Sequence, residues 1–213
     1  MQKVNQQSNP VLLVHGIWDT GKVFRRMIPF LNQRGLKVYD LDLAPNDGTV
    51  GLDDLAQQVA AKVEATFGKE QPFDLLGFSM GGIVSRYYIQ RLGGINRVQR
   101  FIALSAPNHG TVIAYFNQGL GCVQMRPNSH FLKDLNSDVQ MLSQINFTSI
   151  WTPYDMMIFP ASSSKMPVGD NVVVSVMNHA WMLTDEKSLR AIATALSSPV
   201  TEREGGSEGV GEE

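Results

Sequence analysis

The stretch Gly77-Phe78-Ser79-Met80-Gly81 constrains the fold of this chain more than any other part of its sequence. An apolar run from Phe73 to Phe78 leads straight into Ser79, and a helical pattern follows from Ile83 to Leu92. A serine between a strand and a helix sits on a sharp turn with its hydroxyl exposed above the sheet, and small residues two before and two after it prevent clashes. The simpler interpretation is a Gly-Ser turn of no chemical meaning, but the strand and helix around Ser79 favour a nucleophile.

Apolar strands alternate with helices along the rest of the chain. Val11 to Val14 is apolar on both faces, which is typical of a buried parallel strand. The clearest helix is Leu52 to Phe67, with apolar side chains along one face and Gly68 just past its end. This alternation predicts an α/β architecture, a mostly parallel sheet of about six strands with helices on both faces. Together with the serine between strand and helix, it favours the α/β-hydrolase type of fold. The other expected strands are 36–43, 98–104, 147–151 and 171–176, and two further helices are expected within 18–31 and 184–196.

The length of 213 residues suits one compact domain. We expect an N-terminal segment at 1–9, the hydrolase domain at 10–200, and an acidic disordered tail at 201–213, which carries five glutamates and one arginine. Within the domain, the irregular stretch 107–144 is expected to hold one or two helices, and the cap over the site is expected to be either minimal or a partial one formed by this stretch.

The net charge of −2 comes without a basic stripe, so nucleic acid is not an expected partner. A single cysteine, Cys122, excludes an internal disulfide and is interpreted as a buried small hydrophobe rather than a reactive thiol. No apolar run approaches the roughly 18 residues that cross a bilayer, and the first nine residues are polar. We therefore expect a cytoplasmic protein, or a secreted one if a leader is missing from this sequence.

A serine nucleophile needs a base that takes its proton and an acid that orients the base. In this architecture the chain order is serine, then acid, then histidine. Of four histidines, only His179 follows the last expected strand, so it is the predicted base. Asp155 follows the fifth expected strand and is the predicted acid. Asp170 is its rival, but it precedes the sixth strand and should lie at the opposite edge of the sheet.

The oxyanion formed in acyl transfer needs two backbone N–H groups aimed at it. Met80, directly after the nucleophile, is one predicted donor, and Ile17 in the loop after the first strand is the other. Trp18 is a weaker candidate. Gly16 allows a tight turn there, and His15 is expected to pack and hydrogen-bond beneath the loop rather than act as a second base.

Apolar residues near these positions predict a groove for an acyl chain. The candidate lining residues are Trp18, Val112, Tyr115 and Met156. The simpler interpretation of each is an ordinary core residue of α/β packing. With one cysteine and scattered histidines, the sequence contains no cluster of metal ligands, and the chemistry needs neither a metal nor a cofactor.

Several motifs together resemble the small bacterial lipases of the α/β-hydrolase superfamily, over residues 10 to 197. The resemblance implies that Ser79, Asp155 and His179 form the catalytic triad of that family and that Ile17 and Met80 are its oxyanion donors. It also implies a structural role for His109. The motifs are Val14-His15-Gly16-Ile17-Trp18, Gly77-Phe78-Ser79-Met80-Gly81-Gly82 and Ala106-Pro107-Asn108-His109-Gly110-Thr111, followed by Asp155 and His179.

These expectations describe a serine hydrolase that cleaves carboxylic esters, a lipase or esterase acting on a small-molecule or lipid ester with an apolar acyl chain. An acyl thioesterase or an acyltransferase would use the same groups and is the alternative. A non-catalytic binding protein on a hydrolase scaffold is a further alternative, but it predicts a lost triad position, and every position is present. An apolar groove is also consistent with transient contact with a lipid surface. The sequence does not indicate an oligomeric state.

Overall fold

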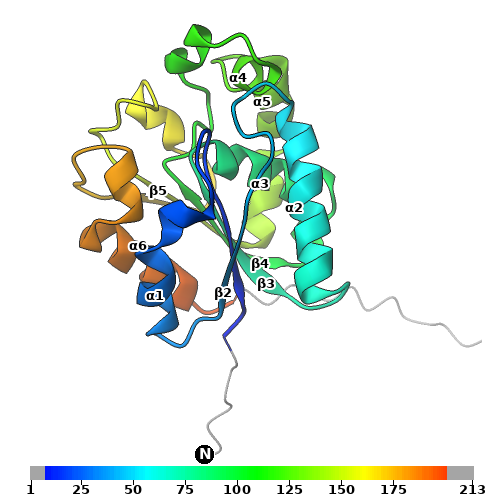
Figure 1. Ribbon diagram of the computed structural model, residues 1–213, viewed down its shortest axis with the longest axis vertical. Coiled ribbons are helices and arrows are strands. Elements are labelled where there is room, and N and C mark those ends of the chain that lie inside the picture. The colour runs from blue at the N-terminus through cyan, green and yellow to red at the C-terminus, as the bar shows by residue number, and fades with distance from the viewer. Residues whose placement is uncertain (1–7, 201–213) are drawn as a thin grey trace, which may run out of the picture.

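A computed structural model describes residues 8–200, and within them six strands form one parallel sheet in the order β2-β1-β3-β4-β5-β6 (Figure 1). Every neighbouring pair is parallel, as the alternating sequence pattern predicts. The central strands are buried along their length, whereas β6 at the edge is largely exposed. The strands are β1 (Val11–Val14), β2 (Val38–Leu41), β3 (Phe73–Phe78), β4 (Val98–Leu104), β5 (Asn146–Trp151) and β6 (Asp170–Val173).

Helices cover both faces of this sheet, so that the core is divided in two. Along β1, Leu12 belongs to the core beneath α2 and α3, and its neighbour Leu13 belongs to the core beneath α1 and α6. Successive side chains of a strand point to opposite faces, which explains why β1 must be apolar throughout. The helices are α1 (Met27–Asn32), α2 (Leu52–Phe67), α3 (Met80–Arg91), α4 (Leu120–Gln124), α5 (His130–Ser137) and α6 (Glu186–Ser197).

Several element boundaries differ from the prediction by one or two residues, and two differ by three. Helix α3 begins at Met80, immediately after Ser79, although Gly81 and Gly82 are poor helix formers. Strand β6 ends at Val173, and residues 174–176 are not part of it, because the N–H of Val176 turns back to the carbonyl of Val174. In both cases tertiary contacts outweigh local preference, because the glycines are needed for close packing and the edge strand has a partner on one side only.

The segment between β4 and β5 lies over the carboxyl ends of the strands, where α4 and α5 are drawn at the top of Figure 1. It contains these two short helices and 3₁₀ turns at Val112–Phe116 and Val139–Gln144, in agreement with the helices predicted for 107–144. Within residues 8–200, no helix is long and apolar enough to cross a membrane. The predicted disordered tail, 201–213, lies outside the described residues, as do the first seven residues.

Candidate active site

Ser79 occupies the turn between β3 and α3 in a strained backbone conformation. Its φ of 54° and ψ of −125° are rarely adopted by a residue with a side chain, and its N–H donates to the carbonyl of Leu104, 2.9 Å away. The flanking glycines make the turn possible. A side chain at Gly77 would overlap the backbone of Gly81, and one at Gly81 would overlap the backbone of His15. The motif around Ser79 therefore forms the strand–turn–helix unit that the sequence predicts.

Asp155 and His179 form a hydrogen-bonded pair next to this turn. The Nδ1 of His179 lies 2.7 Å from the Oδ2 of Asp155, and both side chains are largely buried. The other carboxylate oxygen accepts from the N–H groups of Met157 and Ile158, each at 2.9 Å. These bonds hold the carboxylate in place, so that Nδ1 is the protonated nitrogen and Nε2 is left to accept a proton.

Further contacts fix the two loops that carry this pair. The hydroxyl of Thr152 donates to the carbonyl of Val176 at 2.5 Å, which ties the loop after β5 to the loop after β6. The ring of Phe78 lies 4.7 Å from that of His179, centroid to centroid. Asp170 is the first residue of β6 and is exposed at the amino end of the strand, away from the pair, as the sequence predicts.

Two backbone donors next to Ser79 are free to bind an anion. Neither the N–H of Ile17 nor that of Met80 donates a hydrogen bond to any atom of residues 8–200. The N–H of Trp18 is instead bound to the carbonyl of Asn46 at 2.9 Å, which removes Trp18 as a donor. Donors to an oxyanion must be unengaged in this way, and the role of Ile17 and Met80 in the reaction stays a prediction.

His15 is fully buried and uses both ring nitrogens. Its Nδ1 lies 2.8 Å from the carbonyl oxygen of Gly16, and its Nε2 accepts from the N–H of Leu43 at 2.9 Å. The prediction that His15 supports the loop is confirmed. His109 is exposed and lies away from the pockets at Ser79, with its Nδ1 3.4 Å from the amide nitrogen of Asn136.

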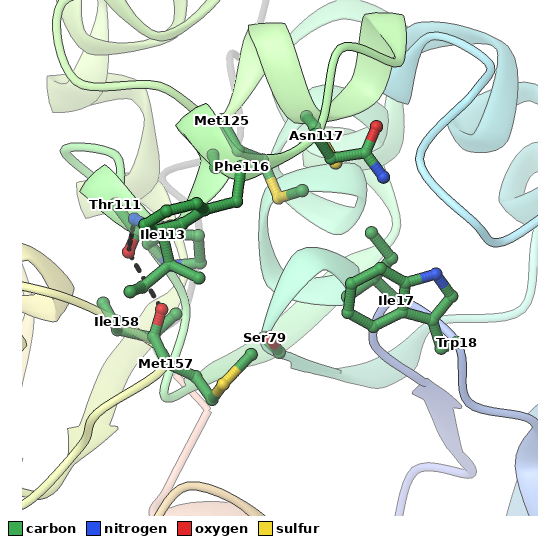
Figure 2. Close-up of a pocket in the computed structure, with 13 residues that line it drawn as sticks. Ile17, Trp18, Ser79, Thr111, Ile113, Phe116, Asn117, Met125, Met157 and Ile158 are labelled. Atoms are coloured by element: carbon green, nitrogen blue, oxygen red, sulfur yellow. Dashed lines mark hydrogen bonds between the residues drawn. The ribbon is translucent and has the colours of Figure 1, made fainter.

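A pocket of about 180 Å³ opens beside Ser79, with Trp18 and Met157 on either side of the serine (Figure 2). We call it the apolar pocket, since no charged side chain lines it. Cys122 lies in its wall and is buried, and burial raises the pKa of its thiol. Other lining residues are Ile17, Ile113, Ala114, Phe116, Met125 and Ile158.

The predicted lining needs correction for three residues. Trp18 lines the pocket, but Val112, Tyr115 and Met156 do not, and their neighbours Ile113 and Phe116 do. Residues 112–116 form a 3₁₀ turn, in which side chains three apart are eclipsed.

The two faces of that turn explain the correction. Ile113 and Phe116 share its inner face, whereas Val112 and Tyr115 share the outer face, where the Tyr115 ring packs 4.9 Å from the guanidinium of Arg126. Met156 is 81% exposed. The sequence gives no sign of which face turns inward.

Thr111 joins the wall of the apolar pocket to the loop that carries the acid, a role absent from the prediction. Its hydroxyl donates to the carbonyl of Met157 and accepts from the N–H of Phe159, each at 2.9 Å (Figure 2 draws the first bond). The same oxygen also accepts from the N–H of Ile113. A threonine before an apolar run is a sequence signal for the local cap on Ile113, but the partners Met157 and Phe159 are 46 and 48 residues away.

Arg86 on α3, which the sequence did not single out, is the largest fully buried side chain of the described residues. Its guanidinium donates to the carbonyl of Leu135 at 3.0 Å and to the side-chain oxygen of Asn136 at 2.9 Å, and more weakly to Asn108. Burial lowers its pKa to about 9, against the field of Asp138. Arg86 thereby links α3 to α5 and to the loop that leads into the apolar pocket.

Comparison with known proteins identifies the family of this chain. The model of the palmitoyl protein thioesterase family matches residues 10–116, half of the chain. The chain belongs to this family. The matched region runs from β1 past β4 and includes Ser79, Ile17 and Met80, and it ends before Asp155 and His179.

Curated relatives of the family cover the same region. The lysosomal thioesterase PPT2 of Homo sapiens is 35% identical over 107 residues, and that of Bos taurus is 36% identical over 107 residues. Each alignment covers 47% of this chain and 34% of the relative, so the chain corresponds to about a third of the length of these proteins.

Solved structures share the α/β-hydrolase fold of this chain over most of its length. The mature lipase BlEst2 of Bacillus licheniformis superposes with a TM-score of 0.76 at 15% identity, covering 90% of this chain and 93% of the lipase. Lipase B of Aspergillus fumigatus gives 0.75 at 19% identity, covering 91% of this chain and 53% of the lipase. At these identities the likeness concerns the fold, including the regions that carry Asp155 and His179.

Proposed function

We propose that this chain is a serine hydrolase that releases apolar acyl chains from thioesters. The observation that carries the proposal is the Asp155–His179 pair, joined at 2.7 Å, whose imidazole lines a pocket together with Ser79. Membership of the palmitoyl protein thioesterase family favours the thioester over the oxygen ester, which the sequence alone put first. The groups that would do the chemistry are the same for both linkages.

The proposed acylation step moves one proton and exchanges one bond. The Oγ of Ser79 attacks the carbonyl carbon while the Nε2 of His179 takes the hydroxyl proton, and Asp155 stabilises the imidazolium. The N–H groups of Ile17 and Met80 donate to the oxyanion of the tetrahedral intermediate. The carbon–sulfur bond then breaks, and the leaving thiol takes the proton from His179.

The second half-reaction returns the serine to its starting state. A water molecule gives one proton to His179 and attacks the acyl-serine carbonyl, the oxyanion collapses, and the proton passes back to the Oγ of Ser79. The product is a free carboxylic acid. The apolar pocket next to Ser79 supports an apolar acyl group, because burying a hydrocarbon chain there is favourable by about 0.8 kcal/mol per methylene.

The test compares a matched pair of octanoyl substrates, a thioester and an oxygen ester of otherwise identical leaving groups. We expect kcat/KM to be about tenfold or more higher for the thioester, and a fluorophosphonate to label Ser79 and no other serine. Equal or higher activity on the oxygen ester would assign the chain to the esterases. A folded sample that neither reacts with the fluorophosphonate nor hydrolyses either substrate would contradict the whole proposal and favour a binding protein on this scaffold.

A further inference from the structure

A second pocket meets the apolar pocket at Ser79. It has a volume of about 490 Å³ and shares Trp18, Ser79 and Met157 with the apolar pocket, but it is the one that contains His179. We call it the His179 pocket. The Nδ1 of the imidazole is hydrogen-bonded to the Asp155 carboxylate, so Nε2 is the nitrogen that can protonate a leaving atom.

The position of this nitrogen divides the substrate between the two pockets. If Ser79 and His179 act as proposed above, the leaving group must lie next to His179 when it departs, and therefore in the His179 pocket. The acyl chain then takes the apolar pocket on the other side of the serine. The following inference rests on that proposed function.

The His179 pocket is charged, in contrast to the apolar pocket. Lys22 lines it from the 3₁₀ turn Gly21–Phe24, and Arg25 lines it from the next position, where its N–H donates to the carbonyl of Lys22 and caps the turn. Residues three apart in such a turn are eclipsed, so both cations project from one face. Within residues 8–200, neither side chain forms an ion pair or a hydrogen bond.

Asp19 is the carboxylate that lines the His179 pocket, and it lies close to the reacting groups. A side chain on Gly16 would contact both the Cβ of Ser79 and the Oδ2 of Asp19, which places the carboxylate beside the serine. Burial raises the pKa of Asp19, against the fields of His15 and His179. A negative group in the substrate is therefore disfavoured beside Asp19 and favoured at Lys22 and Arg25.

We infer that the His179 pocket selects leaving groups that carry a phosphate monoester several atoms from the scissile bond, with Lys22 and Arg25 as its contacts. A guanidinium and an ammonium on one face match the charge and the oxygen geometry of a phosphate. Two sources share this chemistry: a phosphorylated thiol released from a thioester, and a phosphorylated glycerol released from a lipid.

The experiment measures kcat/KM for two pairs of octanoyl substrates that differ only by a phosphate. The first pair is the thioesters of pantetheine and of 4′-phosphopantetheine, and the second is 1-octanoylglycerol and its 3-phosphate. We expect about a tenfold preference for the phosphorylated member of at least one pair, decreasing with added salt because exposed charges are screened. A preference in the first pair alone identifies a thiol source, and one in the second pair alone identifies a lipid source.

Variants assign this preference to the two cations. In the double variant Lys22→Gln, Arg25→Gln the ratio within each pair should fall to about one, and a ratio is insensitive to the fraction of enzyme that folds. Arg26→Gln is the matched control, because Arg26 is the adjacent exposed cation and does not line the pocket. It should keep the wild-type ratio.

The possible failures are distinguishable. Hydrolysis of the neutral substrates with no phosphate preference, a preference that survives in the double variant, or an equal loss in Arg26→Gln would overturn this inference and leave the proposed function standing. Absence of hydrolysis of all four substrates by folded wild-type protein would overturn both.

Discussion

The two pockets that meet at Ser79 are built in different ways. The His179 pocket is organised by polar contacts, with the imidazole held by a carboxylate that itself accepts three hydrogen bonds. The apolar pocket is shaped by side-chain packing. Thr111 connects two of its walls across the sequence, and Arg86 binds Asn108, next to the lining residue Pro107. The His179 pocket therefore positions charged and proton-transferring groups, whereas the apolar pocket sets the shape of the space beside Ser79. Substitutions on the two sides should therefore have effects of different size and kind.

The largest effect is expected where the two pockets meet. Ser79→Ala removes the proposed nucleophile, and we expect kcat to fall by about 10⁴-fold or more on any acyl substrate. Ser105→Ala is the matched control, because Ser105 is buried at the end of the neighbouring strand with φ of 44° and its hydroxyl makes no hydrogen bond within residues 8–200. Substantial hydrolysis by a purified, folded Ser79→Ala protein would remove Ser79 from the reaction.

On the polar side, Asp155→Asn should cost about 10³-fold in kcat. An amide in place of the carboxylate no longer stabilises the imidazolium that forms during attack and favours the wrong tautomer of His179. Asp170→Asn, at the opposite end of the sheet, should leave the steady-state rate close to wild type. If the two variants exchange these outcomes, the acid is Asp170.

Arg86→Met tests the support of the apolar side. We expect the free energy of unfolding, measured by denaturant titration, to fall by about 3 kcal/mol, since the buried carbonyl of Leu135 and the Asn136 side chain lose a charged donor. Arg190→Met is the control, because Arg190 forms an exposed i,i+4 pair with Glu186 that should contribute less than about 1 kcal/mol. Equal losses in the two variants would show that the Arg86 contacts add little.

The smallest effect concerns the shape of the apolar pocket. Ile113→Trp should lower kcat/KM about tenfold for hexadecanoyl substrates and leave butanoyl substrates little changed, because the larger ring fills space that a long chain needs. Val112→Trp, on the outer face of the same 3₁₀ turn, should leave the chain-length profile unchanged. A profile altered by Val112→Trp instead would place the acyl chain along the outer face.

Much of the fold follows from local pattern. The β3 and β4 bounds and the α2 bounds agree with the residues predicted, because buried strands and an amphipathic helix carry their own periodicity. The position of Ser79 on a strained turn also follows, since the flanking glycines have few other uses. His179 and Asp155 could be named from chain order, and the 2.7 Å contact between them agrees with that choice. Their catalytic roles stay predictions.

The remainder depends on contacts between distant segments. The inward face of residues 112–116 is set by Thr111 bonding to residues 157 and 159, so no local pattern distinguishes Ile113 from Val112. Arg86 looks like a surface charge in the sequence and is buried only because α5 supplies acceptors some 50 residues away. Lys22 and Arg25 line a pocket only because the fold brings their turn beside His179.

The sequence by itself determined the sheet, the turn at Ser79 and the order of the proposed reacting groups, because backbone preference and burial are encoded within a few residues. Only the tertiary structure decided which N–H groups stay free, which side chains line each pocket, and where the charges lie. These properties are set by the packing of loops at the carboxyl ends of the strands, where residues far apart in the chain become neighbours.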